Sequence, residues 1–171
     1  VGVIFCSDQV EKFIPPRKGK NHILRIIRDL LEFKPQNKGT DLNPGLVQLT
    51  HGVKRRCTAF LVSDFITRNY FNNLKMAKSK HDIIAIKCFD ELEKDLPKIG
   101  LVKMLNPETG EENWVNTNAK STRENYKSWW NNISSEFNEC CKKTGIDRVV
   151  LNTNENYVTP LMKVFKKREG K

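Results

Sequence analysis

The sequence predicts an α/β fold, a three-layer arrangement in which helices cover both faces of an open, mostly parallel β-sheet. Residues 57–65, CTAFLVSDF, form a nearly continuous apolar run that ends in a polar pair, and a second such run, DIIAIKCF, occupies 82–89. Apolar runs without alternation are typical of strands buried on both faces of a parallel sheet. The segment between them, FNNLKMAKSKH at 71–81, is typical of a helix. This β–α–β order favours parallel strands joined by a crossover helix.

The N-terminal third predicts a hairpin followed by two helices. VGVIFC and VEKFI are β-rich runs joined by SDQ, which indicates two antiparallel strands. Residues 21–33 carry apolar side chains at the three-and-four spacing of an amphipathic helix, namely Ile23, Ile26, Ile27, Leu30 and Leu31. A second helix is expected from about Leu42 to Val53, with Thr40 or Asp41 as its N-cap.

The C-terminal half predicts a second hairpin, a long helix, a last strand and a last helix. NPETGEE lies between two short strand-like pieces in 101–115, which we expect at the edge of the sheet. The longest helix is predicted at 123–143, the strand at 147–153 and the last helix at 158–168. The long helix should bury one face. That face consists of Tyr126, Trp129, Trp130, Ile133, Phe137, Cys140 and Cys141.

Length and composition indicate one domain over residues 1–171. The chain is 38% hydrophobic and 29% charged, and no apolar run approaches the length of a membrane helix. Its five cysteines are odd in number and form no CxxC pair, so a reducing cytoplasm is expected. The chain begins inside an apolar run without Met, from which we expect an N-terminally truncated, partial domain.

The formal net charge of +10 favours acidic partners, whether nucleic acid, an anionic membrane face or an acidic protein surface. It does not choose among them. The basic residues are scattered, and the first interpretation of the basic tail is solvated surface. That tail consists of Lys163, Lys166, Lys167 and Arg168.

Polar residues at the ends of the predicted parallel strands are the first candidates for a site, because ligands of open α/β sheets bind there. Asp64 stands out because an acid directly follows a fully apolar strand, although it could simply cap the next turn. The full set is Ser63, Asp64, Asp90, Asn152 and Thr153. Thr40 and Asp41 lie just before a predicted helix, where a helix cap is the simpler interpretation.

Taken together, three tracts of the chain resemble a known family. PPRKGKNH, GTDL and VSDF occur here in the order and setting of the bacterial von Willebrand A-like domains found next to MoxR-type AAA ATPases, a domain family of unknown function. The resemblance covers nearly the whole chain, including NYVTPLMKVFKKR at its end. It implies a von Willebrand A or Rossmann-like fold with a metal-ion-dependent adhesion site. By resemblance, the Thr40 hydroxyl would ligate the ion and Asp64 would act through water, with Asp41 and Ser63 beside them. Such oxygen ligands suit Mg²⁺.

The chain departs from that family in one important respect. The DxSxS motif of the first strand is missing, and CSDQ carries Asp and Ser in the wrong order. We therefore expect Mg²⁺ in the full-length domain and weak or no Mg²⁺ binding by this chain. We also expect an exposed sheet seam that is open to pairing with another chain, which would form a dimer.

The leading hypothesis is a non-enzymatic, metal-assisted protein-interaction module that works with a MoxR-type AAA ATPase or its client in assembling or maturing a bacterial complex. The alternative is a basic nucleic-acid-binding domain. A hydrolase ranks last because the sequence has no nucleophile elbow, phosphate-binding loop or paired histidines, so no catalytic or cofactor-binding residue is predicted.

Overall fold

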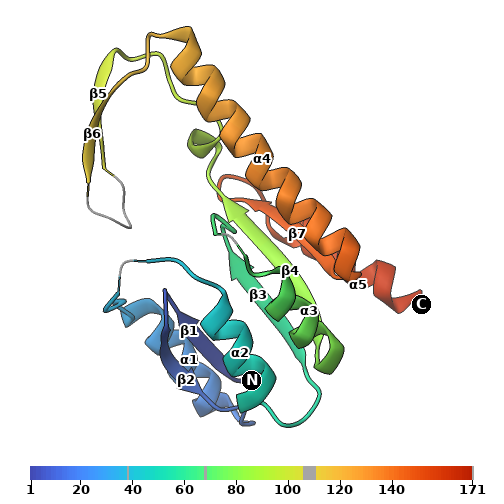
Figure 1. Ribbon diagram of the computed structural model, residues 1–171. Helices are drawn as coiled ribbons and strands as arrows, with labels where there is room; N and C mark the ends of the chain where they lie inside the picture. The colour runs from blue at the N-terminus through green and yellow to red at the C-terminus, as the bar shows by residue number, and fades with distance from the viewer. Residues whose placement is uncertain (38, 68, 106–110, 171) are drawn as a thin grey trace. The chain divides into compact units, whose positions relative to one another are not determined.

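The computed structural model describes residues 1–37, 39–67, 69–105 and 111–170, which divide into two compact units. The first unit contains Val1–Cys57 and Thr67–His81. The described residues of the second unit are 58–66, 82–105 and 111–170. Figure 1 labels the helices and strands, and each unit is described by itself below.

The first unit is built on an antiparallel hairpin that supports a helix. Strands β1 (Val3–Cys6) and β2 (Val10–Ile14) pair with an irregularity after Phe5. Helix α1 (Lys20–Glu32) contributes Ile26 to a small core with Phe5 and Ile14. Phe33, just after the helix, stacks on Phe5 with ring centroids 4.6 Å apart. The predicted hairpin and first helix are confirmed.

Two further helices complete the first unit. Helix α2 (Asn43–Gly52) packs against α3 (Phe71–Lys80) and the hairpin. His81 is fully buried, and its Nε2 lies 3.0 Å from the Leu49 carbonyl oxygen. Burial lowers the pKa of this imidazole, so it is neutral at physiological pH and joins the end of α3 to α2.

The second unit contains a three-stranded parallel sheet in the order β3–β4–β7. Its strands are β3 (Thr58–Ser63), β4 (Asp82–Phe89) and β7 (Asp147–Asn152). The registers pair Ser63 with Lys87 and Phe89 with Asn152, so the carboxyl ends of all three strands meet at one edge. The α/β class and the parallel pairing of these strands are as the sequence predicts.

Two helices cover opposite faces of this sheet. Helix α5 (Val158–Glu169) packs Leu161 and Val164 on the face that presents Ile84 and Ile86. Helix α4 (Lys120–Thr144) contacts the alternate residues of β4, because Trp130 packs on Phe89 and Ser134 contacts Lys87. Successive side chains of a strand point to opposite faces, so α4 and α5 lie on different sides. Figure 1 shows both helices running beside the parallel strands.

One sequence-based expectation about the sheet is wrong. The hairpin β5 (Leu101–Leu105) and β6 (Glu112–Asn116) forms a two-stranded sheet of its own and is not the edge of the parallel sheet. Within the described residues β1 likewise pairs with β2 alone, in a separate two-stranded sheet. In each hairpin the backbone hydrogen bonds join two strands that follow each other in the sequence. The sequence pattern of a single strand does not reveal which sheet the strand joins.

Strand β3 also differs from its prediction as a strand buried on both faces. Phe60 and Val62 are 49% and 61% exposed, whereas β4 is buried from Ile83 to Lys87. The reason is position: β4 lies between two strands, while β3 pairs with β4 alone in the described part of the sheet. Its apolar residues therefore line a sheet edge.

The long helix α4 confirms most of its predicted buried face. Trp130, Phe137, Cys140 and Cys141 are buried, but Trp129 is exposed. The helix ends at Gly145, whose φ of 64° lies in the left-handed region that glycine adopts at low cost. At the other end, the Arg123 guanidinium donates to the Thr117 and Asn118 carbonyls at the base of the β5–β6 hairpin.

The short 3₁₀ helix η1 (Glu91–Glu93) follows β4, and Asp90 is its N-cap.

In the part of the chain that the structure describes, no helix has both the length and the apolar character needed to cross a membrane.

Candidate functional site

Glu11, on β2, holds the loop that carries Thr40. Its carboxylate accepts hydrogen bonds from the Ser7 hydroxyl at 2.7 Å and from the backbone N–H groups of Gln36 and Asn37 at 3.2 and 3.0 Å. These bonds, the Ser7 hydroxyl first among them, lower the pKa of Glu11 to about 2. A charged carboxylate thus anchors the start of the loop to the hairpin.

The middle of the same loop passes close to the hairpin turn. A Cβ atom at Gly39 would lie 3.0 Å from the Cβ of Asp8, so a larger residue there would force one of the two segments to move. The Asp41 backbone N–H donates to the Ser7 carbonyl at 2.9 Å. The glycine of the GTDL tract is therefore explained by close packing.

Asp41 and Thr40 play different parts at the start of α2. The Asp41 carboxylate accepts from the Asn43 backbone N–H at 2.9 Å and from the Asn43 side-chain amide at 2.8 Å. The N-cap position is Leu42 and not Thr40 or Asp41 as predicted. Asp41 is the residue just before the N-cap, and its carboxylate stabilises the start of the helix. Thr40 is exposed, and within the described residues its hydroxyl makes no hydrogen bond. Its oxygen is thus available to a ligand.

At the end of β3, Ser63 and Asp64 form a tight polar turn. Asp64 Oδ1 accepts from the Ile66 backbone N–H at 2.9 Å, and Ser63 Oγ accepts from the Phe65 N–H at 3.0 Å. Phe65 has a φ of 57°, a conformation that costs a bulky residue about 1–2 kcal/mol. Its ring is 1% exposed and packs on Phe137 with centroids 4.4 Å apart. Packing of this ring holds Asp64 in place.

The ends of β4 and β7 bring together three of the predicted residues. Asp90 Oδ2 accepts from the Thr153 hydroxyl at 2.8 Å, and Asp90 Oδ1 accepts from the Leu92 N–H at 2.9 Å. These hydrogen bonds lower the pKa of Asp90. Asn152 donates to the Glu91 carboxylate at 3.0 Å. The carboxyl edge of the sheet is therefore polar, as expected, but much of its hydrogen-bonding capacity is used internally.

Lys87 lies just inside this edge and is a residue that the sequence analysis missed. It is 2% exposed, and its Nζ donates to Ser134 Oγ at 3.3 Å and lies 5.0 Å from the ring centroid of Trp130. Burial lowers the pKa of this amine, while the charge of Asp64 acts in the opposite direction. A lysine inside the apolar run DIIAIKCF was the available signal.

These residues supply only part of a metal site. Threonine hydroxyl and aspartate carboxylate oxygens are ligands that Mg²⁺ accepts, and Thr40 and Asp64 have such atoms. Among the residues that the structure describes, no group of three or more His, Cys, Asp or Glu side chains could hold a metal ion. Thr40 belongs to the first unit and Asp64 to the second, so a site made by both stays a prediction.

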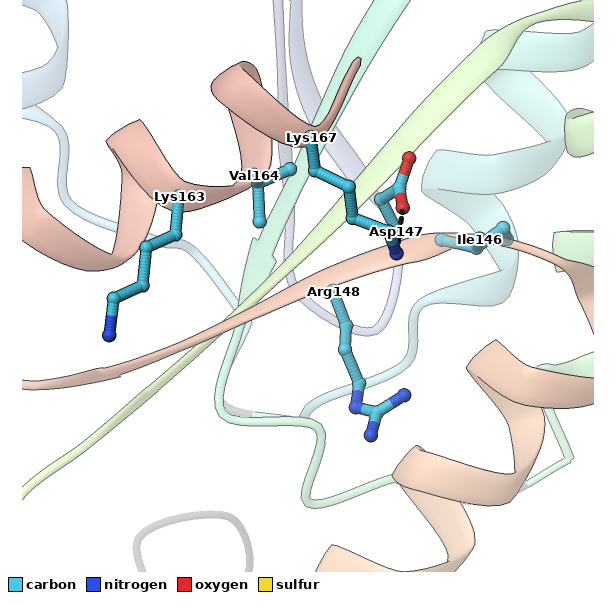
Figure 2. Close-up of a pocket in the computed structure, with 6 residues that line it drawn as sticks. All are labelled: Ile146, Asp147, Arg148, Lys163, Val164 and Lys167. Atoms are coloured by element: carbon cyan, nitrogen blue, oxygen red, sulfur yellow. Dashed lines mark ion pairs between the residues drawn. The ribbon is translucent and has the colours of Figure 1, made fainter. Parts of the chain in front are cut away.

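A pocket of about 350 Å³ lies between β7 and α5. Figure 2 shows Lys167 reaching the Asp147 carboxylate, with which it forms an ion pair at 3.5 Å. The side chains of Lys163 and Arg148 point away from this pair. Because the cations do not converge, the pocket has no built anion site.

Arg168, predicted to be part of a solvated basic tail, is instead a structural residue. Its guanidinium donates to both oxygens of Asp82 at 2.7 and 2.8 Å and to Asp147 at 2.8 Å. Each carboxylate in turn raises the pKa of Arg168, Asp82 more than Asp147. The residue therefore joins the end of α5 to the first residues of β4 and β7.

The architecture of the second unit and its polar strand ends define an α/β domain with a candidate ligand-binding edge. Comparison of the sequence with known protein families gives a more specific assignment of the chain. The family model described as "Protein of unknown function DUF58" matches residues 1–134, and the chain belongs to this family.

Its curated relatives are bacterial and uncharacterized. The uncharacterized protein Rv1480 of Mycobacterium tuberculosis is 25% identical over 113 residues, which cover 64% of this chain and 36% of that protein. The uncharacterized protein MAV169 of Mycobacterium avium is 22% identical over 158 residues, which cover 91% of this chain and 93% of that protein. The chain thus spans about a third of the length of the first of these relatives. No solved structure matches the chain significantly.

Proposed function

We propose that this chain is part of a non-enzymatic, metal-assisted protein-interaction module of the von Willebrand A type, which works with a MoxR-type AAA ATPase in assembling or maturing a bacterial complex. In such a module a partner carboxylate completes the coordination of a bound Mg²⁺ ion. The resemblance of PPRKGKNH, GTDL and VSDF to that family supports the proposal.

The observation that carries the proposal is the state of its two predicted ligands. Thr40 presents an exposed hydroxyl on a loop that Glu11 anchors from β2. Asp64 follows a parallel strand and is fixed by the Ile66 N–H through one carboxylate oxygen. The Asp64 carboxylate is thus oriented before an ion binds, and the exposed Thr40 hydroxyl lies on a loop whose start is anchored.

The two donors cannot complete an octahedral shell, so the remaining ligands would come from a DxSxS strand in the full-length domain and from water. In the described sheet β3 pairs with β4 alone, so its other edge is where we expect such a strand to add. The metal would hold the partner by accepting one of its carboxylate oxygens.

Calorimetric titration with Mg²⁺ tests the metal site. The 171-residue chain should bind Mg²⁺ weakly or not at all, whereas a longer natural protein that includes a DxSxS strand should bind it. In that longer protein, Thr40→Ala and Asp64→Asn should each weaken binding by roughly tenfold or more. Asp95→Asn, which changes an exposed carboxylate outside the site, is the matched control. Tight Mg²⁺ binding by the 171-residue chain alone would contradict the proposal.

The partner is tested separately with the MoxR-type ATPase of the same bacterium. The longer protein should bind it in Mg²⁺, and EDTA or Asp64→Asn should reduce that affinity. Equal affinity with and without Mg²⁺ would exclude the metal-assisted part, and no binding in either condition would exclude this class of partner.

Nucleic-acid binding is the alternative, supported by the net charge of +10. Fluorescence anisotropy with a labelled duplex at increasing salt distinguishes the two, because phosphate contacts make affinity fall steeply with salt. Absence of binding at low salt would remove this alternative.

A further inference from the structure

Helix α1 exposes an apolar face that its own unit does not cover. Five aliphatic side chains on α1 are exposed by 43% to 80% of their surface: Ile23, Leu24, Ile27, Leu30 and Leu31. At roughly 100° per residue, these positions form one stripe about 120° wide. Contiguous apolar surface of this kind marks interaction sites on folded proteins.

The orientation of α1 is fixed by contacts on a different side. Ile26 packs into the hairpin core, and Asp29, one turn later, pairs with Lys12 on β2 at 3.0 Å. Phe33, just after the helix, stacks on Phe5 and so makes a third contact with the hairpin. Because three successive contacts hold one side of α1 to the hairpin, the helix cannot turn its exposed stripe inward without losing them.

The spacing of the stripe suits another helix better than a lipid surface. The pairs Ile23–Leu24 and Leu30–Leu31 are seven residues apart with Ile27 between them, which is the repeat of a helix–helix seam. An amphipathic helix that lies in a membrane interface commonly carries Trp and Phe beside Leu on its apolar face, and its polar face is free. Here the stripe is purely aliphatic, and the adjoining side of α1 is bound to the hairpin.

The charged residues beside the stripe indicate what kind of helix would bind there. Lys20 lies at the N-terminal end of the stripe, seven residues before Ile27, and Arg28 flanks it; both are exposed, and neither forms an ion pair within the described residues. The preceding loop adds the exposed Arg17 and Lys18. In a second copy of the chain, a parallel pair of α1 helices would bring Lys20 opposite Lys20, and an antiparallel pair centred on Ile27 would place Lys20 beyond the end of the other helix at Glu32. Neither arrangement gives Lys20 an acidic partner, so a second copy fits poorly.

We propose that the stripe of α1 is a docking site for an amphipathic helix of a partner protein, with an aliphatic seam and acidic flanking residues. The partner's aliphatic side chains would pack between those of the stripe, and its carboxylates would lie near Lys20 and Arg28. No cation ligand lies on the stripe, so this binding is independent of the metal-assisted function proposed above.

Two synthetic helical peptides test the proposal, each about three heptads long so that it can form a stable helix. Both have Leu at the seam positions, and the flanking residues are Glu in one and Lys in the other. The intact chain should bind the Glu peptide at least about tenfold more tightly than the Lys peptide, as measured by fluorescence anisotropy. EDTA should leave the affinity unchanged, which separates this site from the metal site.

Substitutions on and off the stripe provide the controls. Ile27→Asp should weaken binding of the Glu peptide at least about tenfold, whereas Leu92→Asp, which changes an exposed leucine on η1, should not. The double substitution Lys20→Glu with Arg28→Glu should reverse the preference between the two peptides. Circular dichroism checks that each variant is folded.

Four results would overturn the proposal. The first three are equal binding of both peptides or of neither, loss of binding in Leu92→Asp as in Ile27→Asp, and binding of the chain to vesicles of phosphatidylcholine and phosphatidylserine that Ile27→Asp removes. The fourth is self-association of the chain that Ile27→Asp abolishes, measured by sedimentation velocity, which would assign the stripe to a second copy.

Discussion

At the scale of single residues, Lys87 is the least expected feature of the protein. It occupies the central strand of a parallel sheet, 2% exposed, with a hydroxyl and two aromatic rings as its described neighbours. A buried amine costs free energy unless it is paired, and Asp64 and Glu93 act on it only through their fields. The residue is therefore a source of instability in the fold.

Replacing Lys87 by Met should stabilise the protein by roughly 1–2 kcal/mol at neutral pH, because an apolar side chain of similar length fits the same space. Burial lowers the folded-state pKa below the usual 10.5. The cost of burying the charge is therefore fully present below the folded-state pKa and disappears as pH rises to 10.5. Denaturant unfolding at neutral and alkaline pH measures this gain, which should shrink as pH rises. Lys75→Met on the exposed side of α3 is the control.

Glu11 provides a second prediction at this scale. Its pKa is about 2 in the folded protein against 4.5 for an unperturbed glutamate, so its contribution to stability is complete above 4.5 and is lost as pH falls through 2. Glu11→Gln should lower stability at neutral pH and flatten the loss on acidification, as seen by thermal unfolding. Glu32→Gln, an exposed change on α1, should leave the acid profile unchanged. Identical profiles for Glu11→Gln and the parent protein would contradict the anchoring role.

At the scale of elements, Arg168 joins the end of α5 to the first residues of β4 and β7 through Asp82 and Asp147. Its side chain is 24% exposed, so solvent screens the two ion pairs only in part. The acidic partners lie in strands and the base in a helix, which makes this a tertiary contact between elements distant in the sequence.

Arg168→Gln should destabilise the protein by roughly 1–3 kcal/mol, because it removes the charge-assisted hydrogen bonds that two partly buried carboxylates accept from the guanidinium. Denaturant unfolding of this variant and of Lys166→Gln, an exposed lysine two residues earlier, makes the comparison. A similar midpoint for both variants would show that the ion pairs contribute nothing net.

The open edge of β3 carries a prediction of the same scale. Phe60 and Val62 are exposed, and β3 has one strand partner among the described residues, which favours pairing with another strand. The 171-residue chain should therefore self-associate at high concentration. Val62→Lys should shift the chain toward monomer in sedimentation velocity, since a charge on an edge strand opposes pairing. A chain that stays monomeric at every concentration would refute this.

At the scale of the whole molecule, the chain forms two compact units, and the two predicted metal ligands lie in different units. The first unit contributes the anchored loop with Thr40, and the second contributes the parallel sheet with its polar edge. The model of the family of unknown function matches residues 1–134, which include residues of both units. A test of the function therefore needs both units together.

Sequence alone determined the local elements, because their signals are local. The apolar run DIIAIKCF became the buried central strand, and the spacing of Trp130 and Phe137 placed one side of α4 in the core. The strand-end positions of Asp90 and Thr153 made both residues site candidates, and they meet because β4 and β7 are neighbours in the sheet.

Tertiary structure decided what depends on neighbours distant in the chain. Phe60 and Val62 have the pattern of core residues, yet they are exposed because β3 has one strand partner in the described sheet. Lys87 and Arg168 have the character of surface residues, yet the first is buried under α4 and the second is enclosed by two aspartates. A residue's chemistry is fixed by the sequence, but its burial and its charge partners are set by the elements packed around it, and those come from remote parts of the chain.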